Sequence, residues 1–186
     1  MSELEDIWNL MLSGKEYDAT HTGLRDLLME TRMKLWKFNN LAPNETEEMQ
    51  KILRDLFGSI GERFIINQPF RCDYGKNIFL GEDCFINFNC TILDEAKVTI
   101  GNHAFIGPNV SIYTACHPLE PQKRNQFIEW AEPVTIGDNV WIGGGATILP
   151  GVSLGDNVVI GAGAVVTKDF PSNVVIGGNP ATVIKT

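Results

Sequence analysis

One histidine of this chain stands where it could act as a general base. His117 lies in the segment Tyr113-Thr-Ala-Cys-His-Pro118, at the start of a long stretch that interrupts a regular repeat. An imidazole titrates near neutral pH and can take a proton from a hydroxyl group, which contributes about 10²- to 10⁴-fold in rate. His103 is expected at a solvated corner of the repeat, and His21 in a linker between helices.

Polar residues at two other places in the repeat could support such chemistry. Asn87 and Asn89 stand where many repeats have glycine. Their amides are either aimed at a reacting group or simply suited to a left-handed corner. Asp94 and Glu95 lie in a two-residue insertion, so we expect their carboxylates to project from the wall. There they would be solvated, orient an imidazole or bind sugar hydroxyls.

A glycine-dense segment, Trp141-Ile-Gly-Gly-Gly145, is the next part of the repeat after the interruption. Glycine lets a ligand or another chain approach the backbone closely. A tight corner accounts well for Gly143, and less well for Gly144 and Gly145.

The repeat that carries these residues has a period of six. A helix repeats near 3.6 residues and an exposed strand near 2, so neither produces this pattern. Eleven of twelve hexads have Ala, Val or Cys four places after the large aliphatic residue. Three hexads make a triangular turn of eighteen residues, which predicts a mainly β fold, a parallel β-helix. The aliphatic positions are Leu80, Ile86, Ile92, Ile100, Ile106, Ile112, Ile136, Ile142, Ile148, Leu154, Ile160 and Val166.

Two insertions interrupt the period. Two residues are inserted between Ile92 and Ile100, and eighteen between Ile112 and Ile136. A solenoid wall has little room for the longer insert, so residues 113–133 should leave the wall as a loop. Long loops in compact domains are usually functional or disordered. This loop begins beside His117.

The chain before the repeat, residues 1–60, is expected to form a helical cap. We predict helices at 3–12, at 24–38 and around Met49–Phe57, the last with a capping box of Asn44 and Glu47 and an end at Gly58. These short amphipathic helices should cover the open first turn of the solenoid, which occupies 61–186. Its beginning, 62–79, is expected to be irregular. Its coils should end near 166, followed by an extended segment at 174–184.

Composition limits the possible partners and compartment. The net charge is −8, and no basic stripe is present, so nucleic acid and anionic membranes are not expected partners. The chain has no signal-peptide pattern at its start and no long apolar run, which predicts a cytoplasmic protein. Cys84, Cys90 and Cys116 occupy the small position of the hexad and are expected to fill the core rather than form disulfides or a zinc site.

The sequence resembles the sugar O-acetyltransferases, a family that includes maltose, galactoside and nodulation acetyltransferases. The resemblance covers nearly the whole chain. It implies a left-handed parallel β-helix with an N-terminal helical cap, and a homotrimer with active sites between subunits. It also implies acetyl-CoA as cosubstrate, a sugar hydroxyl as acceptor and no required metal. The matching motifs are Arg71–Ile78, Ile86–Asn89, Tyr113–Pro118, Val140–Gly144, Gly163–Asp169 and Gly177–Pro180.

The same resemblance assigns roles to individual residues. It implies that His117 is the general base, that Asn87 steadies the transition state, and that Gly144 offers a backbone N–H to the oxyanion and the coenzyme. Asp18 stands next to Ala19, which aligns with an acceptor-binding acid. The implied acceptor contacts are Asp73, Glu95 and Asp18. The implied coenzyme contacts are Trp141, Gly144, Ala162, Thr167, Lys168, Thr182 and Lys185, the last two replacing a pair of arginines in the galactoside enzyme.

Three alternatives remain at this stage. The acceptor could be an antibiotic hydroxyl or an amine instead of a sugar. Some carbonic anhydrases use the same β-helix, but they need three histidines around one zinc. This chain has only His21, His103 and His117, so a zinc enzyme is disfavoured. A non-catalytic scaffold would not need the His117-Pro118 loop.

Overall fold

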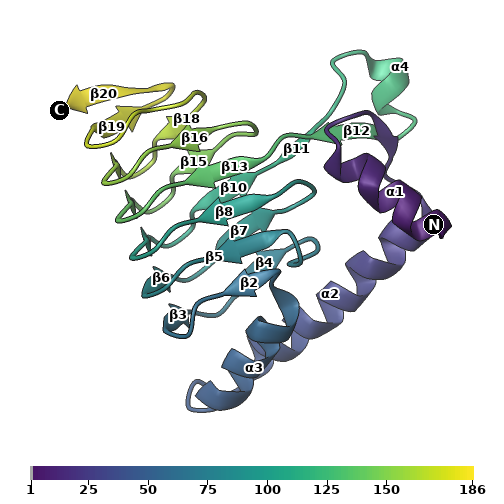
Figure 1. The fold of residues 1–186 in the computed structure, drawn as a ribbon, viewed down its shortest axis with the longest axis horizontal. Coiled ribbons are helices and arrows are strands. Elements are labelled where there is room, and N and C mark those ends of the chain that lie inside the picture. The colour runs from purple at the N-terminus through teal and green to yellow at the C-terminus, as the bar shows by residue number, and fades with distance from the viewer. Residues whose placement is uncertain (1) are drawn as a thin grey trace.

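Three sheets wind around a common axis in the computed structural model, which describes residues 2–186 (Figure 1). We name them sheets I, II and III, in the order in which each coil visits them. Sheet I contains β2 (Ser59–Ile60), β5 (Ile78–Leu80), β8 (Val98–Ile100), β13 (Val134–Ile136) and β16 (Ser153–Leu154). Sheet II contains β3 (Phe64–Ile66), β6 (Cys84–Ile86), β9 (Phe105–Ile106), β14 (Trp141–Ile142), β17 (Val159–Ile160), β19 (Val175–Gly178) and β20 (Ala181–Lys185). Sheet III contains β4 (Phe70–Cys72), β7 (Cys90–Leu93), β10 (Ser111–Tyr113), β15 (Thr147–Ile148) and β18 (Val165–Val166).

The register confirms the predicted parallel β-helix and its eighteen-residue turn in the later coils. Ile136 pairs with Leu154, eighteen residues on. The earlier coils are two residues longer, since Leu80 pairs with Ile100. Their extra residues lie between sheets III and I. In the last coil Ile160 pairs with Ile176, so that turn is two residues shorter.

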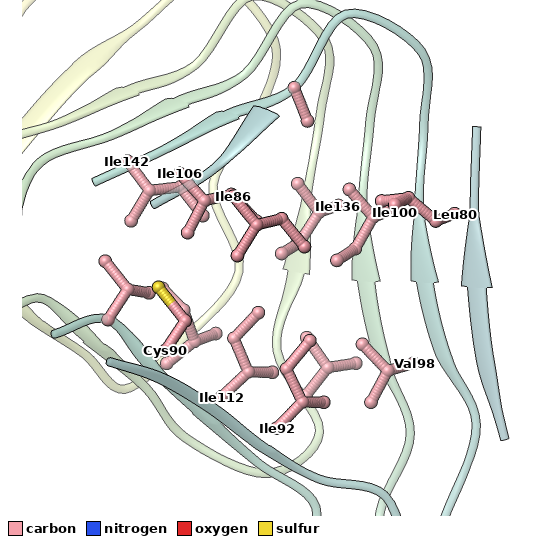
Figure 2. Close-up of a cluster of buried hydrophobic side chains, with 14 of the residues drawn as sticks. Leu80, Ile86, Cys90, Ile92, Val98, Ile100, Ile106, Ile112, Ile136 and Ile142 are labelled. Carbon is pink, nitrogen blue, oxygen red and sulfur yellow. The ribbon is translucent and has the colours of Figure 1, made fainter. Parts of the chain in front are cut away.

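The inward aliphatic side chains stack into columns that form the core (Figure 2). Ile86, Ile106 and Ile142 follow one another in register on sheet II, and all three are buried. Shortening one such side chain to alanine typically costs about 2–5 kcal/mol. Cys84 and Cys90 fill this core as free thiols, as predicted.

Cys116 does not fill the core and is only half-buried. The expectation was wrong because Cys116 lies in the loop and not in the wall of the solenoid.

The beginning of the solenoid is regular, contrary to expectation. Strands β3 and β4 pair in parallel with β6 and β7, and β2 already pairs with β5 from Ser59. Large side chains hide the hexad here, because Phe64 and Phe70 stand in register with Cys84 and Cys90 at the small position. These phenylalanines reach the helices instead of another coil.

The end of the solenoid also differs from the prediction. The coils do not stop at Val166, since Phe170 bridges to Leu154 and β19 extends sheet II in parallel with β17. The last segment is not one extended strand. It is a hairpin in which β20 turns back antiparallel to β19.

Three helices precede the solenoid: α1 (Glu3–Leu12), α2 (Thr22–Asn40) and α3 (Thr46–Leu56). Helices α2 and α3 cover the open first coil, as predicted, and bury Phe38 and Leu53 in the same core as the strands. Helix α1 lies instead against α2 and the long loop (Figure 1). None of the helices in residues 2–186 has the length and apolarity to cross a bilayer.

Both predicted ends of α3 were wrong. Its N-cap is Glu45, with no side-chain cap, and the carboxylate of Glu45 accepts a hydrogen bond from the Ala42 N–H. Gly58 does not end the helix, because its N–H donates to the Ile78 carbonyl and starts the sheet pairing. The tertiary contact at the first coil thus decides where the helix ends.

The long insert leaves the wall between β10 and β13, as predicted, and is ordered. It contains β11 (Ala115–Cys116), α4 (Pro121–Arg124) and β12 (Ile128–Ala131). Strand β12 pairs antiparallel with β11 and with β1 (Tyr17–Asp18) of the cap. This small sheet ties the loop to the N-terminal region.

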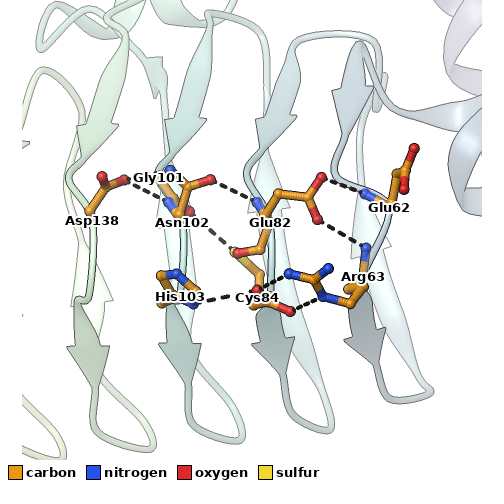
Figure 3. A network of polar contacts seen from close by, with 9 residues as sticks. Glu62, Arg63, Glu82, Cys84, Gly101, Asn102, His103 and Asp138 are labelled. Atoms are coloured by element: carbon orange, nitrogen blue, oxygen red, sulfur yellow. Dashed lines mark hydrogen bonds and ion pairs between the residues drawn. The ribbon is translucent and has the colours of Figure 1, made fainter.

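A ladder of polar side chains runs along the corner between sheets I and II (Figure 3). The Glu82 carboxylate accepts hydrogen bonds from two backbone N–H groups of the preceding coil, at Glu62 and Arg63. Asn102 accepts in the same way from the Glu82 N–H. His103 occupies a left-handed corner here with a largely exposed side chain, as predicted.

Candidate active site

The residues expected to do chemistry lie at two different corners of the triangular solenoid. His117, Asp73 and Glu95 lie where sheet III leads to sheet I, which we call the III–I corner. Asn87 and Gly144 lie where sheet II leads to sheet III, the II–III corner. One strand of sheet III separates the two corners, about 15 Å at ~3.3 Å per residue.

His117 follows β11 at the start of the loop. Its Nδ1 lies 3.6 Å from Oε2 of Glu129, and its side chain is 55% exposed while that of Glu129 is 13% exposed. This distance is too long for a good hydrogen bond, and the contact is an ion pair only when the imidazole is protonated. With Nδ1 facing the carboxylate, Nε2 is the nitrogen available to a substrate.

Glu129 is held in place by the cap. The buried Tyr17 hydroxyl donates a hydrogen bond to Glu129 Oε1, and the two residues are cross-strand partners in β1 and β12. Burial raises the pKa of the Glu129 carboxyl, while the hydrogen bond from Tyr17 and the nearby His117 act in the opposite direction. Burial and the hydrogen bond to Glu129 also raise the pKa of Tyr17.

Sequence reasoning missed Glu129 and Tyr17. The loop carries three glutamates, Glu120, Glu129 and Glu132, and nothing in their spacing shows which one faces the imidazole. The pairing of β12 with β1 decides this, and two-residue strands such as β1 carry almost no periodic signal.

The expectation that Asp94 projects from the wall was wrong. Asp94 is fully buried, and its carboxylate accepts hydrogen bonds from the backbone N–H groups of Asp73, Tyr74 and Asn77. Burial raises its pKa to about 7, although these backbone hydrogen bonds oppose the rise. The two extra residues of the coil fold inward, where the N–H groups of the preceding coil satisfy the Asp94 carboxylate.

Glu95 is buried as well. Its Oε2 lies 3.2 Å from the hydroxyl of Thr114, and its side chain is hydrogen-bonded to Asp73. Burial raises the pKa of Glu95 to about 10, and Asp73 adds to the rise. The Glu95 carboxyl is therefore protonated at neutral pH. The structure thus brings the two predicted acceptor contacts together, beside Thr114, which stands three residues before His117 in the sequence.

Asp18 is not brought into this cluster. It is exposed on β1, and its Oδ1 accepts hydrogen bonds from the Thr20 N–H and hydroxyl. Its neighbour Tyr17 points to the opposite face of the strand, toward Glu129.

A groove of about 490 Å³ lies along the II–III corner and sheet II. Four of the predicted residues line it together: Asn87, Trp141, Gly144 and Ala162. Trp141 lies on the outer face of sheet II, in register with Phe105, and its side chain is 58% exposed. The groove is therefore apolar on one side and backbone-lined on the other.

Free donors point along this corner. No hydrogen bond among residues 2–186 uses the N–H of Gly144 or of Ala162. The Asn87 Oδ1 accepts from the Phe88 N–H at 2.8 Å, which leaves its NH₂ group available as a donor. Gly145 has a left-handed φ of 71°, a conformation that glycine adopts freely and that asparagine adopts at Asn89 and Asn109, so the corner accounts for glycine there. Gly144 has no such φ.

The other predicted coenzyme contacts do not line the groove. Thr167 and Lys168 are exposed after β18, on the III–I side. Thr182 and Lys185 are exposed on β20 at the end of sheet II. All four lie at the C-terminal end of the solenoid, away from the helical cap.

Comparisons with known proteins agree with this arrangement. Residues 133–168 match a family model described as the hexapeptide repeat of succinyl-transferase. Residues 10–61 match one described as the maltose acetyltransferase hexapeptide capping motif. A solved maltose O-acetyltransferase from Clostridium difficile 630 is 50% identical, with a TM-score of 0.95 over 97% of this chain and 96% of that one. The chain belongs to the maltose and galactoside O-acetyltransferase family.

Other members of the family have been solved with the coenzyme bound. The galactoside O-acetyltransferase of Escherichia coli K12 is 39% identical over 93% of this chain and 85% of its own length. A galactoside acetyltransferase solved in complex with coenzyme A is 38% identical, with a TM-score of 0.93 over 96% of this chain and 90% of that one. This acetyltransferase therefore has the left-handed β-helix of its family, and relatives of the same fold bind coenzyme A.

Proposed function

We propose that this acetyltransferase transfers an acetyl group from acetyl-CoA to a hydroxyl group of a sugar. The observation that carries the proposal is the arrangement of His117, with Glu129 behind its Nδ1 and the Asp73–Glu95 pair at the same corner. A base and a hydroxyl-binding pair at one corner are what a hydroxyl nucleophile needs.

The reaction follows from these positions. His117 Nε2 takes the proton of the acceptor hydroxyl while its oxygen attacks the thioester carbonyl carbon. The oxyanion that forms accepts hydrogen bonds from the Asn87 amide and the Gly144 N–H. The carbon–sulfur bond then breaks, and the imidazolium returns its proton to the sulfur. The products are the acetyl ester and the free thiol of coenzyme A.

A sugar fits the acceptor pair because its hydroxyls donate and accept hydrogen bonds. Asp73 has carboxylate oxygens that accept hydrogen bonds from sugar hydroxyls, and the buried, protonated Glu95 donates its own proton to Asp73 and so holds that carboxylate in place. We keep Asp18 as a weaker acceptor contact, at the exposed edge of β1. The acceptors for which two of the relatives are named, maltose and galactosides, agree with a sugar.

The coenzyme would lie along the II–III corner. From Asn87 to Gly161 there are three coil steps, about 14 Å at ~4.8 Å each, a length suited to an extended pantetheine arm. Trp141 and Ala162 would flank this arm. The exposed residues at the C-terminal end would meet the nucleotide: Thr167, Lys168, Thr182 and Lys185.

A homotrimer would complete the site, because one chain holds its two halves at different corners. The outer face of sheet II also presents a column of apolar side chains, in register from Ile65 through Phe85, Phe105 and Trp141 to Val159. The aligned outer positions on sheet III are Arg71, Thr91, Ser111 and Thr147. Burying this column between copies would shield it from water. Sedimentation that found a fully active monomer would overturn the trimer.

The function is tested by coenzyme A thiol release with a panel of mono- and disaccharides, an aminoglycoside hydroxyl and a primary amine. Acetyl transfer to one or more sugars, with ester formation shown by mass spectrometry, is the expected result. Release only with the amine or the antibiotic would overturn the sugar assignment, and no release with any acceptor would overturn acetyl transfer to these classes.

A further inference from the structure

A second groove, of about 450 Å³, lies between α2 and the outer face of sheet III. The helix side carries Arg32, Trp36 and Asn40, and the sheet side carries Arg71 on β4 and Thr91 on β7. These residues have no part in the chemistry described above. The groove is formed by the N-terminal end of the solenoid, opposite to the end where the nucleotide would bind.

The two guanidinium groups that line this groove have no partner within residues 2–186. Neither Arg32 nor Arg71 makes an ion pair or a side-chain hydrogen bond within residues 2–186. Of the other four arginines, Arg54, Arg63 and Arg124 donate to backbone or carboxylate oxygens, while Arg25 of α2 has no such partner within residues 2–186 but lies outside the groove. In a chain of net charge −8, two unpartnered arginines in one groove mark it as a place for an anion.

Trp36 adds a flat apolar surface beside these charges. Its side chain is 65% exposed, although an indole is among the largest apolar side chains. The indole face suits the apolar C–H face of a pyranose ring. Asn40 and Thr91 add short polar side chains to the lining.

The groove is continuous with the acceptor pair. Asp73 lines its end, and the same carboxylate is hydrogen-bonded to Glu95. Leu93 also lines it, and the Leu93 carbonyl accepts from the hydroxyl of Thr114, near the start of the His117 loop. A saccharide of two units could therefore fill the groove with one ring and present the other at the acceptor pair.

We propose that this groove is a second acceptor subsite that binds an acidic sugar unit. Trp36 lies against the ring, and Arg32 and Arg71 bind its carboxylate. The neighbouring unit of the same saccharide presents its hydroxyl at the Asp73–Glu95 pair. This inference rests on the proposed function, because it places the transferred acetyl group on a sugar.

The kinetic test compares two disaccharides that differ only in the non-reacting unit, one with glucuronic acid and one with glucose. We expect kcat/KM to be about tenfold higher for the acidic one, the effect of one charge-assisted pair. Arg32→Gln and Arg71→Gln should each remove about that tenfold advantage and change the neutral acceptor less than about twofold. The matched control is Arg25→Gln, on the same helix but outside the groove. It should change kcat/KM for neither disaccharide.

A binding titration without coenzyme separates this proposal from the proposed function. Calorimetry should detect binding of the acidic disaccharide to the parent protein, and this binding should be lost in Arg32→Gln and Arg71→Gln. Trp36→Leu should weaken the binding of both disaccharides. If no sugar releases thiol but this binding pattern holds, the function fails and the subsite stands. Equal binding of the two disaccharides, or equal losses for both in the arginine variants, would overturn the subsite.

Discussion

Two corners of the solenoid carry pairs of adjacent acidic residues, and the pairs behave in opposite ways. At the I–II corner, Glu82 and Asp83 have lowered pKa values, Glu82 because backbone N–H groups donate to it and Asp83 because Arg63 does. At the III–I corner, Asp94 and Glu95 are buried, and burial raises the pKa of both.

The covering of each corner explains the difference. The I–II corner is open, so its carboxylates are ionised and connect one coil to the next (Figure 3). The III–I corner is covered by the cap and the long loop (Figure 1), and its acidic residues lose contact with water. The same residue types are thus exposed with lowered pKa values at one corner and buried with raised pKa values at the other.

The largest expected effect separates the histidines of the two corners. His117→Ala should fold normally and lose about 10²-fold or more in turnover, since a general base contributes about that much. His103→Ala, beside Asp83 at the open corner, should keep parental turnover. Steady-state kinetics with both variants, with thermal melts as the folding control, make the comparison. Unaltered turnover in folded His117→Ala would show that His117 is not the base.

A smaller effect is expected from the residues that position His117. Glu129→Gln should lower kcat about tenfold with little change in KM, because the contact at Nδ1 orients a group whose whole contribution is about 10²-fold or more. Tyr17→Phe, which loses only the hydroxyl that holds Glu129, should act in the same direction and less strongly. The control is Glu120→Gln, an exposed position of the same loop. A change in KM alone, or an equally large fall in kcat in Glu120→Gln, would show that Glu129 does not position His117.

The two corners should also differ in how pH changes stability. The folded pKa of Glu95, about 10, lies above the unfolded value of 4.5, so the folded state binds the extra proton between these values. Its contribution is therefore lost as pH rises from about 5 toward 10, and Glu95→Gln should flatten that decline by a few degrees in Tm. Glu82 has the opposite sign: its contribution is present above the unfolded pKa and lost as acid is added.

Thermal melts from pH 4 to 9 on both variants measure this difference. Glu82→Gln should alter the acid side only. An alkaline decline in Glu95→Gln as steep as in the parent would contradict the assigned burial effect.

The smallest effect concerns the coenzyme's 3′-phosphate. Thr182 and Lys185 are exposed, and exposed ion pairs contribute roughly 0–1 kcal/mol each. We therefore expect dephospho-acetyl-CoA to be used with a KM within about fivefold of acetyl-CoA. Thr182→Arg should widen that ratio. A hundredfold loss with the dephospho analogue would place a phosphate clamp elsewhere, with Arg124 of the loop as the first position to vary.

The sequence predicted the features that repeat and missed those that depend on contacts between distant segments. The hexad of Ile136 and Leu154 is strong because each coil buries the same positions. The first coil was not predicted because Phe64 and Phe70 stand where the later hexads have a small residue. Burial of Glu95 and the facing of Glu129 toward His117 both require the loop to fold back on the cap. A two-residue insertion and a two-residue strand are too short to show in the sequence pattern that the loop folds back in this way.

We propose that His117 of one copy and Asn87 of another form one site. Co-expression of His117→Ala with Asn87→Ala tests it most directly, each variant alone being impaired. In a cyclic assembly with random mixing, about one quarter of the sites would pair an intact His117 with an intact Asn87. We therefore predict thiol release near one quarter of the parental rate. Activity no higher than the mean of the two separate variants would contradict a site shared between copies.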